Sequence, residues 1–147
     1  MIIKAVHYKG KSLYRAKQKV KYLLVDKNHS KQLIDSKTLL LNFTEADPAK
    51  LHLDYLRNAM HLHKRKNGVK LYHFILSFSK IDSPNITDEM LMDIMQKFIE
   101  VRGISQNVVL GKLHTHEDHK HIHILSSSNP LRSSRPVGNS PSAEQWI

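Results

Sequence analysis

The fold of this protein is decided by one stretch, His114-Thr-His-Glu-Asp-His-Lys-His-Ile-His123, which holds five of its eleven histidines. The residues on both sides alternate between apolar and polar types, as strands do. A two-residue turn at Glu117-Asp118 would join two strands over residues 106–116 and 119–126 into a β-hairpin. The sequence therefore predicts that a hairpin carries the histidines.

This hairpin would place the histidines on one side of a sheet. The predicted turn pairs His114 with His121, puts His123 two residues further along, and leaves all five imidazoles on the same face. A slip of one residue would divide them between two faces. Ile122 and Ile124 would then point to the opposite side, where a core can hold them.

Imidazoles gathered in this way suit a divalent metal ion of borderline softness. Three protein ligands would also leave coordination positions open for a substrate, which catalysis requires. A solvated histidine-rich hairpin without a ligand is the competing interpretation. A single histidine would favour that interpretation, whereas several aligned histidines favour a metal site.

The rest of the chain alternates between strand and helix signals. The expected elements are a strand over 2–8, a helix over 12–26, an apolar stretch over 38–43, a helix over 47–66, a strand over 70–78 and a helix between Thr87 and Gly103. With the hairpin, they predict an α+β fold with helices packed on a central, largely antiparallel β-sheet. Residues 1–126 would form the main domain. Residues 127–147, rich in Ser and Pro, would form a loop or begin a C-terminal extension.

The composition indicates a polyanionic partner. Lys and Arg outnumber Asp and Glu by 23 to 13, which gives a net charge of +10 and a pI near 9.8. Nucleic acid is the first candidate and an anionic membrane surface the second. The chain has no cysteine, so disulfides and thiolate metal sites are excluded. Because no apolar run is long enough for a membrane span or a signal peptide, we expect a cytoplasmic protein without membrane insertion.

A metal ion that holds a phosphodiester still needs a nucleophile, and all five tyrosines precede the hairpin. Tyr72 lies on the apolar side of its strand and is expected in the core. Tyr22 projects nearly opposite the apolar stripe of its helix, beside Lys11 and Arg15. Cations next to an exposed tyrosine suit phosphate chemistry because they attract the nucleic-acid backbone, although a plain surface tyrosine fits equally well. Tyr22 would also face away from the sheet, unless the helix crosses the sheet edge or the metal face opens toward it.

Three motifs resemble plasmid mobilisation relaxases of the HUH endonuclease superfamily. Gly10-Lys-Ser-Leu followed by Lys21-Tyr22-Leu-Leu resembles the nucleophile motif of that family. Lys64-Arg65-Lys66 leading to Tyr72-His73-Phe-Ile-Leu-Ser-Phe78 resembles the segment before the central strand. The stretch from His114 to His123 resembles the histidine motif. Related replication initiators and transposases usually place the tyrosine after the histidines, and that order is impossible here.

The resemblance implies an HUH endonuclease-like fold with a ferredoxin- or RRM-like core, and a site- and strand-specific DNA nickase. Tyr22 would attack the scissile phosphate and form a 5′-phosphotyrosyl link. His114, His121 and His123 would hold a divalent ion, Mg²⁺ or Mn²⁺. The partners would be single-stranded DNA at an origin of transfer and accessory mobilisation proteins.

Further residues are expected around this site. Relatives often carry Asp where this chain has His116, so His116 is a possible ligand. Asp118, when it does not simply form the turn, and His73 would orient the ligands or line the site. The DNA backbone would meet a set of cations, namely Lys11, Arg15, Lys64, Arg65 and Lys66.

Two other functions remain open at this point. His119, His121 and His123 alternate as in histidine-triad nucleotide hydrolases, which need no metal ion and use a histidine as the nucleophile. A non-catalytic DNA- or metal-binding module would also explain the charge and the histidines. The histidine-triad alternative has no role for Tyr22 or for a charge of +10.

Overall fold

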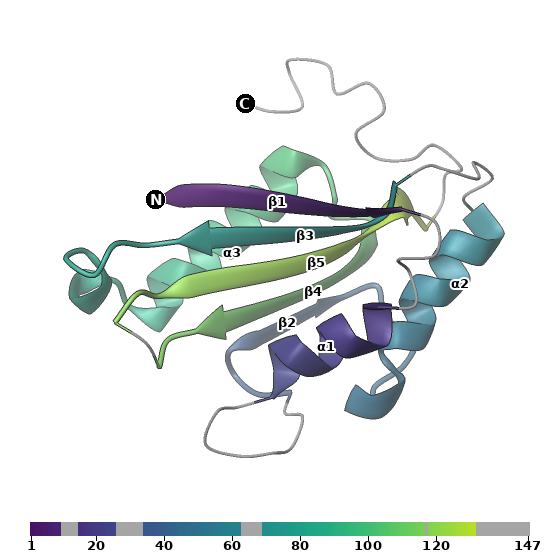
Figure 1. Ribbon diagram of the computed structural model, residues 1–147, viewed down its shortest axis with the longest axis horizontal. Helices are drawn as coiled ribbons and strands as arrows, with labels where there is room; N and C mark the ends of the chain where they lie inside the picture. The colour runs from purple at the N-terminus through teal and green to yellow at the C-terminus, as the bar shows by residue number, and fades with distance from the viewer. Residues whose placement is uncertain (10–14, 26–33, 63–68, 117, 132–147) are drawn as a thin grey trace.

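Five antiparallel strands form one sheet in the order β1-β3-β5-β4-β2 (Figure 1). The computed structural model describes residues 1–9, 15–25, 34–62, 69–116 and 118–131. The central strand is β5 (His121–Pro130), between β3 (Val69–Ser77) and β4 (Asn107–His114). The edges are β1 (Ile2–Lys9) and β2 (Thr38–Leu41). The predicted α+β fold with a central antiparallel sheet is confirmed.

One face of the sheet is covered by α3 (Asp88–Arg102). Its ends are as predicted: the Thr87 hydroxyl accepts a hydrogen bond from the amide of Met90 at 3.2 Å, and Gly103 closes the helix with a φ of 77°. A side chain at Gly111 would collide with the sulfur of Met95, so the bare backbone lets the helix approach β4. The sheet contributes side chains from alternate strand positions to this core, namely Tyr72, Phe74, Leu76, Val109, Leu113, Ile122 and Ile124.

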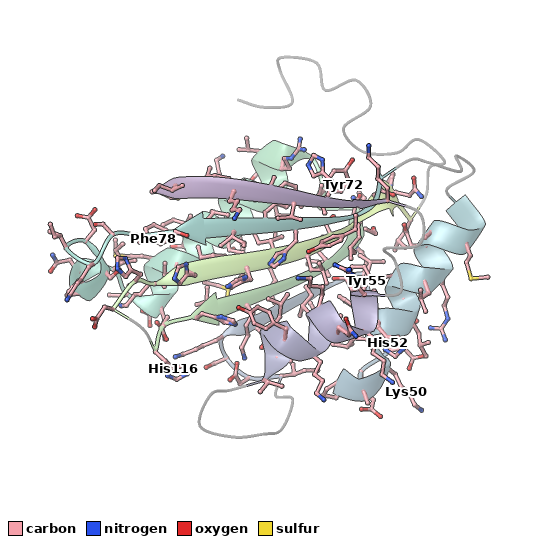
Figure 2. All side chains as sticks on the ribbon, in the orientation of Figure 1. Lys50, His52, Tyr55, Tyr72, Phe78 and His116 are labelled. Carbon is pink, nitrogen blue, oxygen red and sulfur yellow. The ribbon has the colours of Figure 1, made fainter. Side chains whose placement is uncertain are left out.

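The opposite face is covered by α1 (Ala16–Leu24) and α2 (His52–Leu62), the latter preceded by the 3-10 turn η2 (Pro48–Lys50). In Figure 1 these helices lie in front of the sheet and α3 behind it. Tyr55 lies there (Figure 2) and is fully buried. Its hydroxyl donates a hydrogen bond to the carbonyl of Leu125 at 2.6 Å. The sheet side chains in this second core are Leu71, Val108, Leu110 and Leu125. They occupy one end of the face, so the other end is left for the site.

The predicted helix at Asp47 begins as a tighter turn than expected. The Asp47 carboxylate accepts a hydrogen bond from the amide of Ala49 at 3.0 Å, as an N-cap should. The chain then makes the η2 turn before α2, instead of one continuous helix. The expected end of that helix, at residues 64–68, and the expected cap at Ser12 lie outside the described residues.

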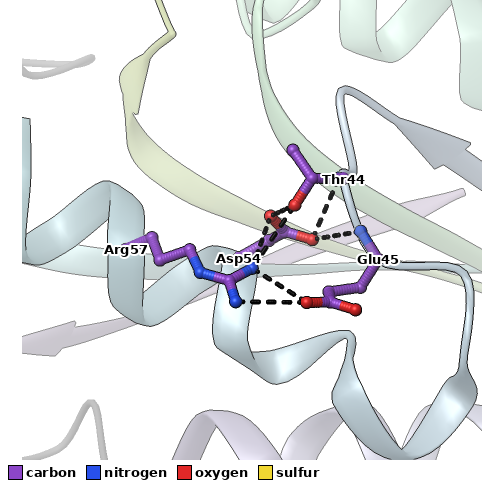
Figure 3. A network of polar contacts seen from close by, with 4 residues as sticks. All are labelled: Thr44, Glu45, Asp54 and Arg57. Carbon is purple, nitrogen blue, oxygen red and sulfur yellow. Dashed lines mark hydrogen bonds and ion pairs between the residues drawn. The ribbon is translucent and has the colours of Figure 1, made fainter.

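Asp54 fixes the connection between β2 and α2 (Figure 3). Its buried carboxylate accepts hydrogen bonds from the amides of Thr44 and Glu45 at 3.1 and 3.0 Å, and from the Thr44 hydroxyl at 2.6 Å. Arg57 lies 3.6 Å from the same carboxylate and bonds Glu45 through both of its terminal nitrogens. Three hydrogen-bond donors and the Arg57 guanidinium around one buried carboxylate hold this turn against the second core.

We expect Asp54→Ala to lower the free energy of unfolding by about 3 kcal/mol, because it leaves the part-buried amides of Thr44 and Glu45 and the Arg57 charge without their acceptor. Urea denaturation followed by circular dichroism measures this change. The control is Arg57→Ala, which removes a half-exposed partner and should cost less than about 1 kcal/mol. Equal losses in the two variants would contradict the central role of the carboxylate.

The hairpin strands differ from the prediction at both ends. They stop at His114 and resume at His121, so the connection is longer than the two-residue turn that was predicted. At its other end β5 continues through Pro130, past the predicted domain boundary at residue 126, and residues 127–129 are buried. The predicted loop is therefore wrong over residues 127–130, and residues 132–147 lie outside the described part.

Side-chain amides explain why these polar residues lie in a buried strand. The Asn107 amide donates to the carbonyl of Ser127 at 2.8 Å, and the Asn58 amide donates to the carbonyl of Asn129 at 2.9 Å. The Ser127 hydroxyl accepts from the amide of Val108 at 3.0 Å. These bonds pair the strand's backbone carbonyls and the Ser127 hydroxyl, whereas the Ser128 hydroxyl and the Asn129 side-chain amide have no hydrogen-bond partner among the described residues. The partners in these bonds come from β4 and α2, so the local sequence did not reveal them.

Candidate active site

An open cavity of about 720 Å³ lies on the uncovered end of the sheet, beside α1. His114, His121 and His123 line it from β4 and β5, and Tyr22 lines it from α1. The register is the predicted one, with His114 paired with His121. Ile122 is fully buried on the opposite face, also as predicted.

His123 lies at the centre of the histidine cluster. Its ring centroid is 4.3 Å from that of His114, 5.2 Å from that of His73 and 6.2 Å from that of His121. His73 comes from β3, next to β5, and is itself buried. Three adjacent strands thus bring four imidazoles together.

Each imidazole in the cluster has a hydrogen-bonding partner. His114 Nε2 donates to the carbonyl of Leu23 at 3.2 Å, which leaves a neutral His114 with its lone pair on Nδ1. His73 Nε2 and His123 Nδ1 are 3.0 Å apart, and the Ser77 hydroxyl is 3.1 Å from His121 Nδ1. Such contacts orient imidazole rings and select their tautomers.

Burial keeps the two innermost histidines uncharged. Desolvation lowers the pKa of His123 to about 3, and the neighbouring His114 and His73 act in the same direction. Desolvation also lowers the pKa of His73 to about 4, with Lys19 and His114 as smaller causes. Neutral imidazoles keep the lone pairs that metal coordination requires.

These shifts predict a loss of stability in mild acid. The two pKa values are lower in the folded protein than the ordinary value of 6.5, so below pH 6.5 the unfolded chain binds more protons and stability falls with pH. Between about pH 7.5 and 5.5 we expect the free energy of unfolding to fall by roughly 2 kcal/mol in metal-free buffer. Denaturation at several pH values measures this slope. His73→Gln should flatten it and the exposed-site control His119→Gln should not, and identical slopes in both would contradict the assignment.

Tyr22 faces the histidine cluster. Its side chain is 60% exposed, and its ring centroid lies 6.1 Å from that of His123 and 6.3 Å from that of His114. The helix α1 covers only one end of the sheet. Tyr22 lies outside the buried stripe of α1, and it can therefore still reach the uncovered end. The contact between His114 and the carbonyl of Leu23 joins the last turn of α1 to β4 at this point. This geometry resolves the conflict that the sequence left for Tyr22.

The cluster offers the chemistry of a metal site, but the described residues do not form one as they stand. Within them, no group of three or more His, Asp or Glu side chains is arranged to hold a metal ion. Imidazoles on adjacent strands nevertheless fit a borderline divalent ion by donor type. The metal ligands accordingly stay a prediction.

Other residues that the sequence predicted for the site have different places. His116 is exposed and lines the cavity (Figure 2). Asp118 is exposed and lies 3.6 Å from Lys80, so it neighbours a lysine and does not line the cavity. Arg15 is exposed at the start of α1, also outside the cavity lining. Lys11, Lys64, Arg65 and Lys66 lie outside the described residues.

The sequence analysis missed a group of charged residues in the cavity. They are Lys4, Lys21, Asp35, Lys37 and Lys112. One signal was available for Lys112: it stands two residues before His114, so alternation places it on the histidine face. Asp35 and Lys37 carry no such signal, because they reach the cavity from the segment before β2.

Comparisons with known proteins assign the family. Residues 22–142 match the relaxase family model described as the MobA/VirD2-like nuclease domain. The fold is similar to a chain solved in work on the molecular basis of vancomycin resistance transfer in Staphylococcus aureus, with a TM-score of 0.58 and 15% identity over 97% of this chain and 77% of that one. At this identity the likeness shows the fold alone. None of the curated proteins matches the sequence significantly.

The chain therefore belongs to the MobA/VirD2-like relaxase nuclease family, and it is a mobilisation relaxase domain that nicks DNA. This confirms the relaxase function predicted from the sequence. The histidine-triad alternative also loses its geometric basis, because His119 does not line the cavity with His121 and His123. No helix in the described part of the chain is long and apolar enough to cross a membrane.

Proposed function

We propose that the domain nicks one DNA strand by transesterification, with Tyr22 as the nucleophile. The observation that supports this most is the convergence of Tyr22, His114 and His123 in one cavity. The Tyr22 oxygen attacks the scissile phosphorus and loses its proton. The bond to the 3′ oxygen breaks, so one product strand carries a 3′-hydroxyl and the other is joined to Tyr22 through its 5′ phosphate.

We further propose that His114, His121 and His123 hold a divalent ion, Mg²⁺ or Mn²⁺. When bound, such an ion would polarise the phosphate and offset charge in the transition state. The proposal rests on the gathering of His114 and His121 around the buried, uncharged His123. His116, at the cavity wall, is a candidate for an additional ligand.

His73 orients His123 in this proposal. Its Nε2 lies 3.0 Å from His123 Nδ1, so a hydrogen on Nδ1 leaves the lone pair of His123 on Nε2. The Ser77 hydroxyl stands in the same relation to His121. These partners keep the rings in one tautomer, which is the usual task of groups behind a metal ligand.

The proposed substrate is single-stranded DNA at an origin of transfer, cut in the cytoplasm and presented with the help of accessory mobilisation proteins. A net charge of +10 favours such a polyanion. An open cavity beside an exposed tyrosine admits an extended strand more readily than a duplex.

The test is covalent trapping. The protein is incubated with Mn²⁺ or Mg²⁺ and a pool of single-stranded oligonucleotides that are randomised in the centre and labelled at the 3′ end. A denaturing gel should show the label on the protein, because the 5′-linked fragment retains the 3′ end. The same pool labelled at the 5′ end should yield only free, shortened DNA. Label transfer from the 5′ end would reverse the proposed polarity.

A further inference from the structure

A buried lysine faces the cavity beside the histidine cluster. Lys112 lies on β4, directly opposite His123 on β5 and two residues before His114. Its side chain is only 8% exposed, yet it lines the cavity. Strand alternation therefore places a fixed positive charge on the same face as the proposed metal ligands.

Two neighbours hold the ammonium group. Lys112 Nζ donates to Asp35 Oδ1 at 2.8 Å and to the Thr38 hydroxyl at 3.1 Å. The Thr38 hydroxyl in turn donates to Asp35 at 3.2 Å, and the backbone amide of Lys37 also donates to that carboxylate at 2.9 Å. An ammonium has three N–H donors, and the contacts recorded among the described residues use two of them. Within the described part of the chain, one donor therefore remains for a ligand in the cavity.

Stability alone does not explain this pair. Taking the Lys112 ammonium out of water costs free energy, and a partly exposed carboxylate offsets only part of that cost. The next residue on the same face of β4, Leu110, is fully buried and apolar. Asp35 is 41% exposed and packs in neither core. The pair lies at the wall of the site, so a role toward its ligand is the better explanation.

The charge around the cavity indicates which ligand this would be. The described residues that line it include four lysines, Lys4, Lys21, Lys37 and Lys112, and one carboxylate, that of Asp35. Lys4 and Lys21 are exposed on the surface, whereas Lys112 is held in place by the strand and its partners. A held cation suits a phosphate at a defined position, and exposed cations suit the general attraction of a backbone.

We propose that Lys112 binds a phosphodiester of the single strand beside the histidine cluster, with Asp35 and Thr38 positioning its ammonium group. This inference rests on the proposed DNA-nicking function of the cavity. The incoming phosphate takes the remaining donor of Lys112, while Asp35 keeps the ammonium directed at it.

The test measures binding separately from nicking. Fluorescence anisotropy of labelled single-stranded DNA is recorded in EDTA at several salt concentrations. We expect Lys112→Met to weaken binding about 3- to 10-fold and to reduce the salt slope by about 0.7, the value for one phosphate contact on a single strand. The control is Lys97→Met on the exposed side of α3, which should bind as the native protein does. Adduct yield with Mn²⁺ should fall at least about 10-fold in Lys112→Met alone.

Two further variants guard against misfolding. Lys112→Gln removes the charge but keeps a hydrogen-bond donor for Asp35 and Thr38. If Lys112→Met does not fold, the salt slope of Lys112→Gln is compared with that of the native protein instead. Lys112→Arg keeps the charge and should retain most of the salt slope. An unchanged salt slope in folded Lys112→Met or Lys112→Gln would overturn the inference, as would an equal loss in Lys112→Arg. Native protein that binds no DNA and forms no adduct would instead overturn the proposed function.

Discussion

Tyr22→Phe is expected to form no covalent adduct with single-stranded DNA, a loss of more than about 10³-fold in nicking, because the only atom removed is the attacking oxygen. The ring remains, so its contacts with His114 and His123 should survive. The measurement is the transfer of a 3′ label to the protein on a denaturing gel, with the rate taken from the first few per cent of reaction.

The matched control is Tyr8→Phe. Tyr8 lies on β1, on the same side of the sheet as the histidines, but it is not part of the cavity wall and its ring is instead 5.4 Å from Lys19 Nζ. This variant should form as much labelled protein–DNA adduct as the native protein does. DNA binding in EDTA should be the same in both variants, which separates lost chemistry from lost affinity. A labelled adduct in folded Tyr22→Phe would assign the nucleophile to another residue.

The histidine register was predictable because alternation and pairing are local. Once His114 pairs with His121, His123 has only one face available, and Ile122 has the other. The length of the connection was not predictable from alternation. Contacts of Lys120 hold the chain before β5 instead: the amide of Phe78 donates to the carbonyl of Lys120, and the amide of Lys120 donates to the Ser83 hydroxyl. Both partners belong to the segment that follows β3.

The parts of the site that sequence could not supply depend on long-range packing. Tyr22 reaches the histidines because α1 covers only part of the sheet. The helical periodicity of the sequence does not encode how far a helix covers a sheet. Lys112 and Asp35 are separated by 77 positions and meet only because β2 pairs with β4. His73 was predicted to orient the ligands or line the site, and the structure buries it against His123. Its role as a partner of another histidine follows from strand order.

The ligands of the proposed metal ion should differ in their effects on Mn²⁺ affinity, measured by isothermal titration without DNA. His123→Ala should cause the largest loss, more than about 100-fold, because His123 lies at the centre of the cluster. His73→Gln, which removes only the partner of His123, should weaken binding by about 10- to 100-fold. Nicking should fall in the same order and should stop in EDTA.

His116→Ala and His119→Ala complete this series. His119 is exposed and outside the cavity wall, so its removal should leave Mn²⁺ affinity and nicking unchanged. His116 lines the cavity but stands beyond the end of β4, and we expect less than about a 5-fold loss if it is not a ligand. A loss as large as that of His123→Ala would make it one. If Mn²⁺ affinity were the same in His123→Ala as in the native protein, the cluster would not be the metal site. The tyrosine would then have to act without a metal ion held by these three histidines.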